Sequence, residues 1–173
     1  MSFVAYLGLG SNVGDRIEHM RAAIRALSSH GIEVEAVSSL YETEPVGEVL
    51  DQPDFLNAAA RVRLELSPEA LLHVCKAIEV EQGRMIGGQR HGPRPLDVDL
   101  LLFDDIELET ERLTLPHPQV TSRRFVLEPL LELDPALKLP DGTRLADALD
   151  ALDSEQRVER VVEPGGWAPA PGS

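Results

Sequence analysis

The stretch FLNAAARVRLEL at residues 55–66 alternates between two kinds of side chain with a period of two. One set is wholly apolar and consists of Leu56, Ala58, Ala60, Val62, Leu64 and Leu66. The other set is mixed and consists of Phe55, Asn57, Ala59, Arg61 and Arg63. Because successive side chains of a strand point to opposite faces of a sheet, the pattern predicts a strand with one core face and one mostly polar face.

The residues before this strand predict a strand, a helix and a second strand. Residues 3–9 are rich in strand-forming side chains and run into GLGSNVGD, whose glycines we expect to supply turn geometry. From Asp15 onward, apolar residues recur at steps of three and four, which predicts an amphipathic helix that ends near residues 30–31. Residues 33–41 predict a second strand, and residues 42–54, with two prolines and a glycine, predict a long loop.

The residues after the alternating strand predict a second helix and a further strand. Ser67, Pro68 and Glu69 form a helix-start signal, and the apolar stripe that follows continues to about residue 82. Residues 83–95 hold four glycines and two prolines, which excludes a regular element and predicts a second long loop. The sequence LDVDLLLF at residues 96–103 then predicts a strand, in which Val98, Leu100 and Leu102 would point to the core.

The resulting order of strand, helix, strand, strand, helix and strand predicts an α+β fold of ferredoxin-like type. We expect an antiparallel sheet with two helices packed on one side of it. Further helices are predicted near residues 123–133 and 144–152, and a strand at residues 158–162. We expect residues 1–164 to form a single domain and residues 165–173, rich in Gly, Pro and Ala, to form a flexible tail.

The composition restricts the classes of partner. Lys and Arg total 16 against 30 Asp and Glu, which gives a formal net charge of −14 and argues against general binding to nucleic acid. Six arginines nevertheless lie between Arg84 and Arg124, so a small anion could meet a locally positive cleft. The single cysteine, Cys75, is expected to be a buried thiol. The N-terminus lacks the pattern of a signal peptide or membrane span, so we expect a cytoplasmic protein.

Two aspartates on the predicted strand 96–103 form a candidate metal site. Asp97 and Asp99 are two residues apart, so both carboxylates project from one face, with Cα atoms roughly 6 to 7 Å apart. Such a pair suits Mg²⁺ that also takes phosphate oxygens. Arg84, Arg90 and Arg94 precede the pair on the glycine-rich loop, and guanidinium groups bind phosphate oxygens bidentately. Together these residues predict a metal-assisted phosphate site.

Two further features concern the nucleotide and a flat ligand. The spacing of Gly8, Gly10 and Gly14 resembles a dinucleotide-binding motif, but Val13 stands where that motif needs its third glycine.

Phe55 and Asn57 share the mixed face of their strand, where an aromatic ring could stack on a heterocycle while the amide binds its edge. The alternative for both residues is simple core packing.

Several segments together resemble the hydroxymethyldihydropterin pyrophosphokinase family. They are YLGLGSNVGDR, SSLYETEPVG, QPDFLNAA, EQGR, RHGPRPLDVDLLLF and LTLPHPQVTSRRFVLEPL, and they extend from about Ala5 to Pro135. The most specific part is GPRPLDVDLLLF followed by LPHP. The resemblance implies a ferredoxin-like fold with a cleft for MgATP and a pterin. It also implies attack of the pterin hydroxymethyl oxygen on the β-phosphorus of ATP, with AMP leaving and two Mg²⁺ ions assisting.

The resemblance also implies roles for individual residues. Those implied to be catalytic are Arg84, Arg94, Asp97 and Asp99, of which the two aspartates would hold the metal. Those implied to contact ATP are Glu79, Arg84, Arg94, Arg112, Thr114, His117 and Arg123. Those implied to contact the pterin are Thr43, Val46, Phe55, Asn57 and Phe125. The chain departs from common family residues at Ile86, Gly87, His91 and Pro118, which puts contacts between the second loop and ATP in question.

Two other functions remain open on the residues alone. A metal-dependent phosphohydrolase could use the same aspartates and arginines, although it gives no reason for Phe55, Asn57 and Phe125. A non-catalytic small-molecule-binding domain of the same topology would not need two acids beside a phosphate site. We expect a monomer whose partners are ATP and 6-hydroxymethyl-7,8-dihydropterin, without nucleic acid or membrane.

Overall fold

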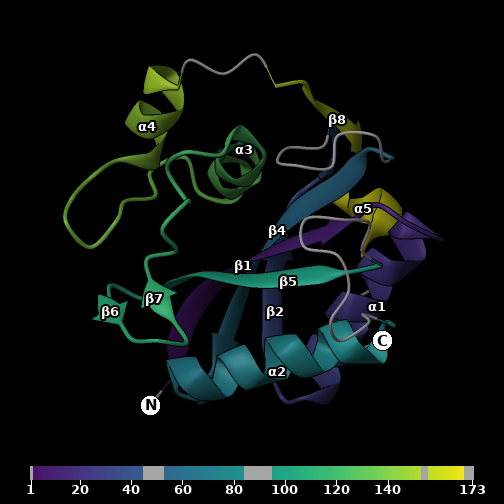
Figure 1. Cartoon of the computed structure of the whole chain (residues 1–173), viewed down its shortest axis with the longest axis horizontal. Helices are drawn as coiled ribbons and strands as arrows, with labels where there is room; N and C mark the ends of the chain where they lie inside the picture. The colour runs from purple at the N-terminus through teal and green to yellow at the C-terminus, as the bar shows by residue number, and fades with distance from the viewer. Residues whose placement is uncertain (1, 45–52, 84–94, 153–155, 170–173) are drawn as a thin grey trace.

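The computed structural model describes residues 2–44, 53–83, 95–152 and 156–169, and it consists of a central sheet with helices on both faces (Figure 1). The elements of the first half are β1 (Phe3–Ser11), α1 (Arg16–Ser29), β2 (Glu33–Val37), β3 (Leu40–Thr43), β4 (Phe55–Leu64) and α2 (Pro68–Glu81). Those of the second half are β5 (Asp97–Phe103), β6 (Leu108–Glu109), β7 (Thr114–Leu115), α3 (Arg124–Leu133), α4 (Leu145–Ala151), β8 (Val158–Val162) and α5 (Pro164–Trp167).

The main sheet is antiparallel throughout the pairs that the structure describes. Its order is β5-β1-β4-β3-β8, and β2 also pairs with β4, beside β3. Strand β4, the alternating stretch of the sequence, lies in the centre because it pairs with β1 from Leu56 to Leu64 and with β2 and β3 on its other side. The order of the elements and their antiparallel pairing confirm the α+β, ferredoxin-like prediction.

Helices cover both faces of the sheet, whereas the sequence predicted helices on one side only. Helices α1 and α2 pack with the apolar set of β4 in one core, which includes Met20, Leu27, Leu71 and Ile78. Helix α3 packs on the opposite face, where Leu127 and Leu130 lie against a second apolar cluster. The single small apolar residue in the mixed set, Ala59, belongs to this second cluster, and it allows α3 to approach β4. The mixed face is therefore partly core.

Two predicted strands have other boundaries in the structure: the first is longer than predicted, and the second is divided in two. Strand β1 continues through Gly8 and Gly10 to Ser11, so these glycines are strand residues, and only Gly14, with φ +72°, occupies a turn conformation. The predicted strand 33–41 is divided into β2 and β3 at Ser38 and Ser39. The Ser38 hydroxyl accepts a hydrogen bond from Ala59 N–H at 2.9 Å and donates one to the Ser39 carbonyl at 2.8 Å.

A β-bulge changes the direction of Leu102. The pairing of β1 with β5 shifts between Tyr6 and Leu7, so that Tyr6 lies opposite Leu102 while Leu7 lies opposite Leu100. Leu102 consequently packs in the second cluster and not with Val98 and Leu100, as the alternation predicted. A bulge adds one residue to one strand and reverses the side-chain alternation beyond it.

The predicted flexible tail is wrong for residues 165–169. Residues 164–167 form the short helix α5, and the Trp167 side chain is only 1% exposed. Its indole N–H donates to the Ser38 carbonyl at 2.9 Å, and its own carbonyl accepts from Arg21 at 2.7 Å. The sequence prediction relied on the Gly, Pro and Ala around Trp167 and gave no weight to the large aromatic ring, which is buried here because its N–H has a partner at Ser38.

Glu132 of α3 fixes the helix to the break between β2 and β3. Its carboxylate accepts hydrogen bonds from Ser39 N–H at 3.0 Å, from the Ser39 hydroxyl at 2.9 Å and from the Tyr41 hydroxyl at 2.6 Å. Burial, together with the hydrogen bond to Glu132, raises the pKa of Tyr41 to about 12. The phenol is therefore a permanent donor to this carboxylate at physiological pH.

We expect Glu132→Ala to destabilise the fold by about 2 to 4 kcal/mol, because it leaves a buried backbone N–H and two hydroxyls without their acceptor. For a chain of this size, thermal unfolding should shift by roughly 2 to 4 °C for each kcal/mol. The measurement is a thermal melt beside Glu128→Ala on the same helix, which removes only an ion pair with Arg124. Equal melting temperatures for the two variants would contradict the prediction.

Candidate functional site

The candidate site lies on the α3 side of the sheet, where four strands bring their ends together. Directly opposed residues of antiparallel strands project to the same face. Gly10 lies opposite both Asn57 and Asp97, and Gly8 lies opposite both Ala59 and Asp99. We define the ligand face as the part of this surface that carries Phe55, Asn57, Gly10, Asp97 and Asp99. The two predicted aspartates and the two predicted β4 residues therefore belong to one surface.

Asp97 and Asp99 fit the donor set of a hard cation. Asp99 is exposed and Asp97 is half-buried at the start of β5, so ligand oxygens could reach both residues. Within the described ranges, no group of three or more His, Cys, Asp or Glu side chains could hold a metal ion. A carboxylate pair still suits Mg²⁺, which commonly takes one or two protein carboxylates and completes its shell with phosphate oxygens and water.

Glu79 of α2 holds the strand that carries the aspartates. Its side chain is almost fully buried, and its carboxylate accepts a hydrogen bond from Val98 N–H at 2.8 Å and lies 3.5 Å from Lys76. Val98 stands between Asp97 and Asp99, so this bond fixes the backbone from which both carboxylates project. The structure thus gives Glu79 a clear positioning role, while its contact with ATP remains a prediction.

Cys75 lies one helical turn before Glu79 in the same core. It is fully buried, as predicted, and burial raises the pKa of its thiol to about 12, with a further increase from the negative charges of Glu79 and Asp99. A thiol with this pKa is protonated near neutral pH and is a poor nucleophile. Helix α2 packs against β5, the strand that carries the acidic pair.

Asn57 is held in a fixed orientation on the ligand face. Its amide nitrogen donates to the Thr43 hydroxyl at 2.6 Å, and both residues are buried. Its amide oxygen lies close to Gly10, since a Cβ atom built on Gly10 would stand only 2.9 Å from it and 3.9 Å from the Phe55 ring. Sequence reasoning treated Gly10 as a turn residue, and only the register of β1 and β4 reveals that it makes room for Asn57.

Arg123, Phe125 and His117 lie at the start of α3 and in the segment before it. The Arg123 guanidinium lies 5.6 Å from the centre of the Phe125 ring, which is a cation–π distance. Burial lowers the pKa of Arg123, and the negative charge of Asp99 opposes this shift. Arginine remains cationic under these conditions. Arg123 therefore supplies a positive charge whose field reaches Asp99.

His117 is a neutral ring with a defined tautomer. Its backbone N–H donates to the Leu101 carbonyl at 2.9 Å, which places it beside β5. Burial lowers the pKa of His117, and the positive charge of Arg123 lowers it further. Because Nδ1 accepts the Gln119 N–H at 3.1 Å, the proton of the neutral ring is on Nε2, which is then a hydrogen-bond donor.

The remaining predicted residues are not brought into the ligand face by the described contacts. Arg112 is exposed in the turn between β6 and β7, and Thr114 lies in β7, opposite Glu109. Val46, Arg84, Arg90 and Arg94 lie outside the described residues. Their roles remain predictions from the sequence.

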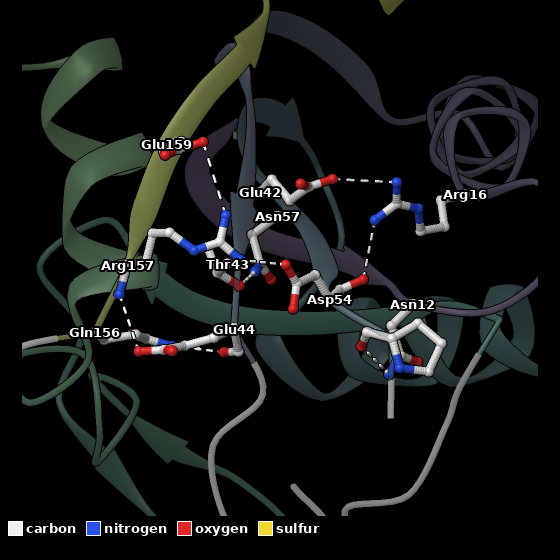
Figure 2. Close-up of polar contacts among 11 residues, drawn as sticks. Asn12, Arg16, Glu42, Thr43, Glu44, Asp54, Asn57, Gln156, Arg157 and Glu159 are labelled. Atoms are coloured by element: carbon white, nitrogen blue, oxygen red, sulfur yellow. Dashed lines mark hydrogen bonds and ion pairs between the residues drawn. The ribbon is translucent and has the colours of Figure 1, made fainter. Parts of the chain in front are cut away.

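Sequence reasoning missed a set of polar residues around the first predicted loop. Arg16 donates to the Asp54 carbonyl at 3.0 Å and to the Glu42 carboxylate at 3.2 Å, and Asn12 donates to the Pro53 carbonyl at 3.2 Å. Figure 2 shows these side chains converging on the residues just before β4. In the sequence, Asp15 only marked where the predicted helix begins, and no local pattern indicated that Arg16 has a partner 38 residues away.

Comparison with known proteins identifies the family. The model of the 7,8-dihydro-6-hydroxymethylpterin-pyrophosphokinase (HPPK) family matches residues 6–135. A 2-amino-4-hydroxy-6-hydroxymethyldihydropteridine pyrophosphokinase from Methylorubrum extorquens is 44% identical over 91% of this chain and 98% of its own length. The protein of the same name from Bacillus subtilis is 46% identical over 77% of this chain and 79% of its own length.

Other relatives are longer. A folate synthesis bifunctional protein from Arabidopsis thaliana is 48% identical over 73% of this chain, and the match spans 26% of that protein. The present chain therefore spans about a quarter of such a bifunctional relative. No helix in the described part of the chain is long and apolar enough to span a membrane.

Solved structures agree with the fold. The HPPK-DHPS of Plasmodium falciparum, crystallised with pteroate, superposes with a TM-score of 0.69 at 16% sequence identity, covering 87% of this chain and 42% of that chain. At this identity the likeness supports the fold alone. The family match over residues 6–135 and the relatives that align along nearly their whole length show that the chain belongs to the 7,8-dihydro-6-hydroxymethylpterin-pyrophosphokinase family.

Proposed function

We propose that this chain transfers a pyrophosphoryl group from ATP to the hydroxymethyl oxygen of 6-hydroxymethyl-7,8-dihydropterin and releases AMP. The observation that carries the proposal is the ligand face, where a carboxylate pair, a fixed amide and an aromatic ring lie on neighbouring strands. A site for Mg²⁺ and phosphate needs the carboxylate pair. A site for a flat heterocycle needs the fixed amide and the aromatic ring. Membership of the family supports the same reaction.

The acidic end of the ligand face would receive MgATP. Asp97 and Asp99 would hold Mg²⁺, and we propose two ions, which would neutralise charge on the phosphates. Arg123 would bind a phosphate oxygen bidentately, and the Nε2–H of His117 would donate to the nucleotide. The chain's own contribution to the chemistry is to hold these groups in place before the reaction, so the two substrates meet without a further ordering cost.

The remaining ATP contacts rest on the family resemblance. Arg84 and Arg94 would bind the phosphates during transfer, Arg112 and Thr114 would contact the nucleotide, and Glu79 would act near it. Glu79 supports the site in any case, because it fixes Val98 N–H between the two aspartates.

The other end of the ligand face would receive the pterin. Phe55 and Phe125 would stack on the two sides of its ring, and Asn57 would bind its polar edge, with Thr43 and Val46 contributing backbone contacts. The hydrogen bond between Asn57 and the Thr43 hydroxyl supports this role, because it fixes which amide atom faces the ligand. No histidine base is needed, since positioning and charge neutralisation supply most of the acceleration.

The reaction is tested by product analysis. The chain is incubated with MgATP and 6-hydroxymethyl-7,8-dihydropterin, and the expected products are AMP and the pterin pyrophosphate in equal amounts. Release of inorganic phosphate without pterin would instead support a phosphohydrolase. Pterin binding without any turnover would support a binding domain. We further propose a monomer, and size-exclusion chromatography tests that state.

We expect Asn57→Ala to weaken pterin binding by about 1 to 3 kcal/mol, or about 5- to 150-fold, while ATP binding changes little. The reason is that the polar edge of the heterocycle loses its hydrogen-bond partner in a buried environment. Isothermal titration with each ligand separately measures the two affinities, and Glu65→Ala, exposed just beyond β4, is the control. An equal loss for both ligands would count against a pterin site at Asn57.

A further inference from the structure

The segment just before β8 contacts the two strand ends that adjoin the pterin end of the ligand face. Gln156 Nε2 donates to the Glu44 carbonyl at 3.0 Å, and Arg157 N–H donates to the Glu44 carboxylate at 3.0 Å. The Arg157 guanidinium pairs with the Asp54 carboxylate. Figure 2 shows Gln156 and Arg157 reaching these two residues from the same strand-forming segment. Residues 156–157 thus join the end of β3 to the start of β4.

The residues that are held in this way adjoin the proposed pterin contacts. Glu44 follows Thr43, and Asp54 precedes Phe55, while Thr43 and Phe55 are themselves opposed in the sheet. β8 continues the same arrangement, because Val158 lies opposite Thr43. A displacement of Glu44 or Asp54 would therefore move Phe55 or the hydroxyl that orients Asn57.

The same segment also contacts the element that carries the second aromatic ring. The Arg124 guanidinium donates to the Gln156 carbonyl at 3.2 Å, and Arg124 is the neighbour of Phe125 at the start of α3. Residues 156–157 consequently link neighbours of both Phe55 and Phe125. Two rings that stack on opposite sides of one ligand must keep a fixed separation. A segment that contacts both of their elements would help to maintain that separation.

We propose that Gln156 and Arg157 are positioning residues for the pterin pocket, a role that rests on the proposed function of Phe55, Asn57 and Phe125. Both residues lie beyond the part of the chain that the family model matches, which ends at residue 135. The ion pair with Asp54 is partly exposed, with 44% and 30% of the two side chains accessible. Such pairs contribute little to global stability, so their loss should appear in the geometry of the site and not in unfolding.

The first test compares Arg157→Met with Arg63→Met. Arg63 is a matched control, because it is also an arginine of the sheet, has 45% of its side chain exposed and pairs with a carboxylate, Glu35. We expect Arg157→Met to raise KM and Kd for the pterin about 3- to 10-fold, with KM for ATP and the melting temperature nearly unchanged. Arg157→Lys should recover part of the loss, because an ammonium can still pair with Asp54.

Two further variants separate positioning from a general effect. Gln156→Ala combined with Arg157→Met should weaken pterin binding more than either change alone. Asp54→Asn combined with Arg157→Met should be no worse than Asp54→Asn alone, since both changes break the same pair. Parallel losses in pterin affinity, ATP affinity and melting temperature would overturn the proposal, and so would unchanged pterin affinity in the double variant of Gln156 and Arg157.

Hydrogen exchange of the ligand-free chain decides the proposal separately from the reaction. We expect Arg157→Met to speed amide exchange in residues 43–44 and 54–57 and Arg63→Met to leave it unchanged there. If the wild-type chain fails to bind pterin while this exchange difference is present, the proposed function is wrong and the support by residues 156–157 stands. If exchange at these residues is unchanged in Arg157→Met, the support is absent.

Discussion

Asp99→Ala should abolish most of the turnover while leaving the fold intact. Loss of a second-shell partner alone costs about 10- to 100-fold in metal affinity or activity, so loss of a direct ligand should cost about 100-fold or more. Asp99 is exposed on β5, and a surface truncation changes unfolding free energy by about 0.5 kcal/mol or less. Asp97→Ala should have a similar effect on turnover, although its half-buried side chain allows a larger change in stability.

The measurement pairs AMP formation at saturating ATP and pterin with a thermal melt of the same sample. Asp105→Ala is the matched control, since Asp105 is an exposed acid just after the same strand. The loss in Asp99→Ala should be reduced by a higher Mg²⁺ concentration, which a purely structural defect would not show. Turnover within a factor of three of the wild type in either aspartate variant would remove that residue from the metal site.

The architecture was largely predictable because long periodic segments determine it. The period-two alternation of residues 55–66 correctly identified β4 and both its faces, and the three- and four-residue steps identified α1 and α2. The helix after Arg123 and the strand at residues 158–162 were also placed correctly. What the periodicity could not show was that α3 covers the mixed face. That depends on which helix reaches Ala59, a contact between residues far apart in the sequence.

The errors have physical causes that a local pattern does not contain. The bulge near Tyr6 depends on how two strands pair, so the reversed direction of Leu102 had no signal in β5 alone. The burial of Trp167 depends on a carbonyl at Ser38, far away in the chain. The aspartate pair and the mixed face of β4 could be predicted, because spacing on a strand fixes the side of projection. The supports Glu79, Gln156 and Arg157 could not be predicted from the residues alone, because their partners lie on other elements.

The role of Gly10 follows from the same register and leads to the largest effect that we expect on the pterin side. Gly10 lies between Asn57 and Asp97 in neighbouring strands, and a Cβ atom there would stand 2.9 Å from the Asn57 amide oxygen and 3.7 Å from the Leu56 carbonyl. Only the approach to the Asn57 amide oxygen is too short, because 3.7 Å is an ordinary van der Waals contact. Any side chain at Gly10 must therefore displace the Asn57 amide.

We expect Gly10→Ala to weaken pterin binding by about 30-fold or more. Overpacking costs about 1 to 3 kcal/mol, and loss of the oriented amide adds about 1 to 3 kcal/mol. Gly8→Ala is the matched control, because it adds the same methyl group to the same strand but meets only the flexible Leu101 side chain, whose nearest atom would lie at 3.3 Å. Titration of pterin in the presence of a nonhydrolysable ATP analogue and Mg²⁺ compares the two variants, and thermal melts confirm that both are folded.

A second substitution separates the clash from other effects of the added methyl group. In Gly10→Ala with Asn57→Ala, the amide oxygen is gone, so the methyl group no longer displaces it. The double variant should then bind pterin about as weakly as Asn57→Ala alone and should recover most of the melting temperature that Gly10→Ala loses. If the double variant instead loses as much pterin affinity as the two single variants lose together, Gly10 acts on the ligand independently of Asn57. If Gly10→Ala binds pterin as tightly as the wild type, the pterin does not lie on this part of the ligand face.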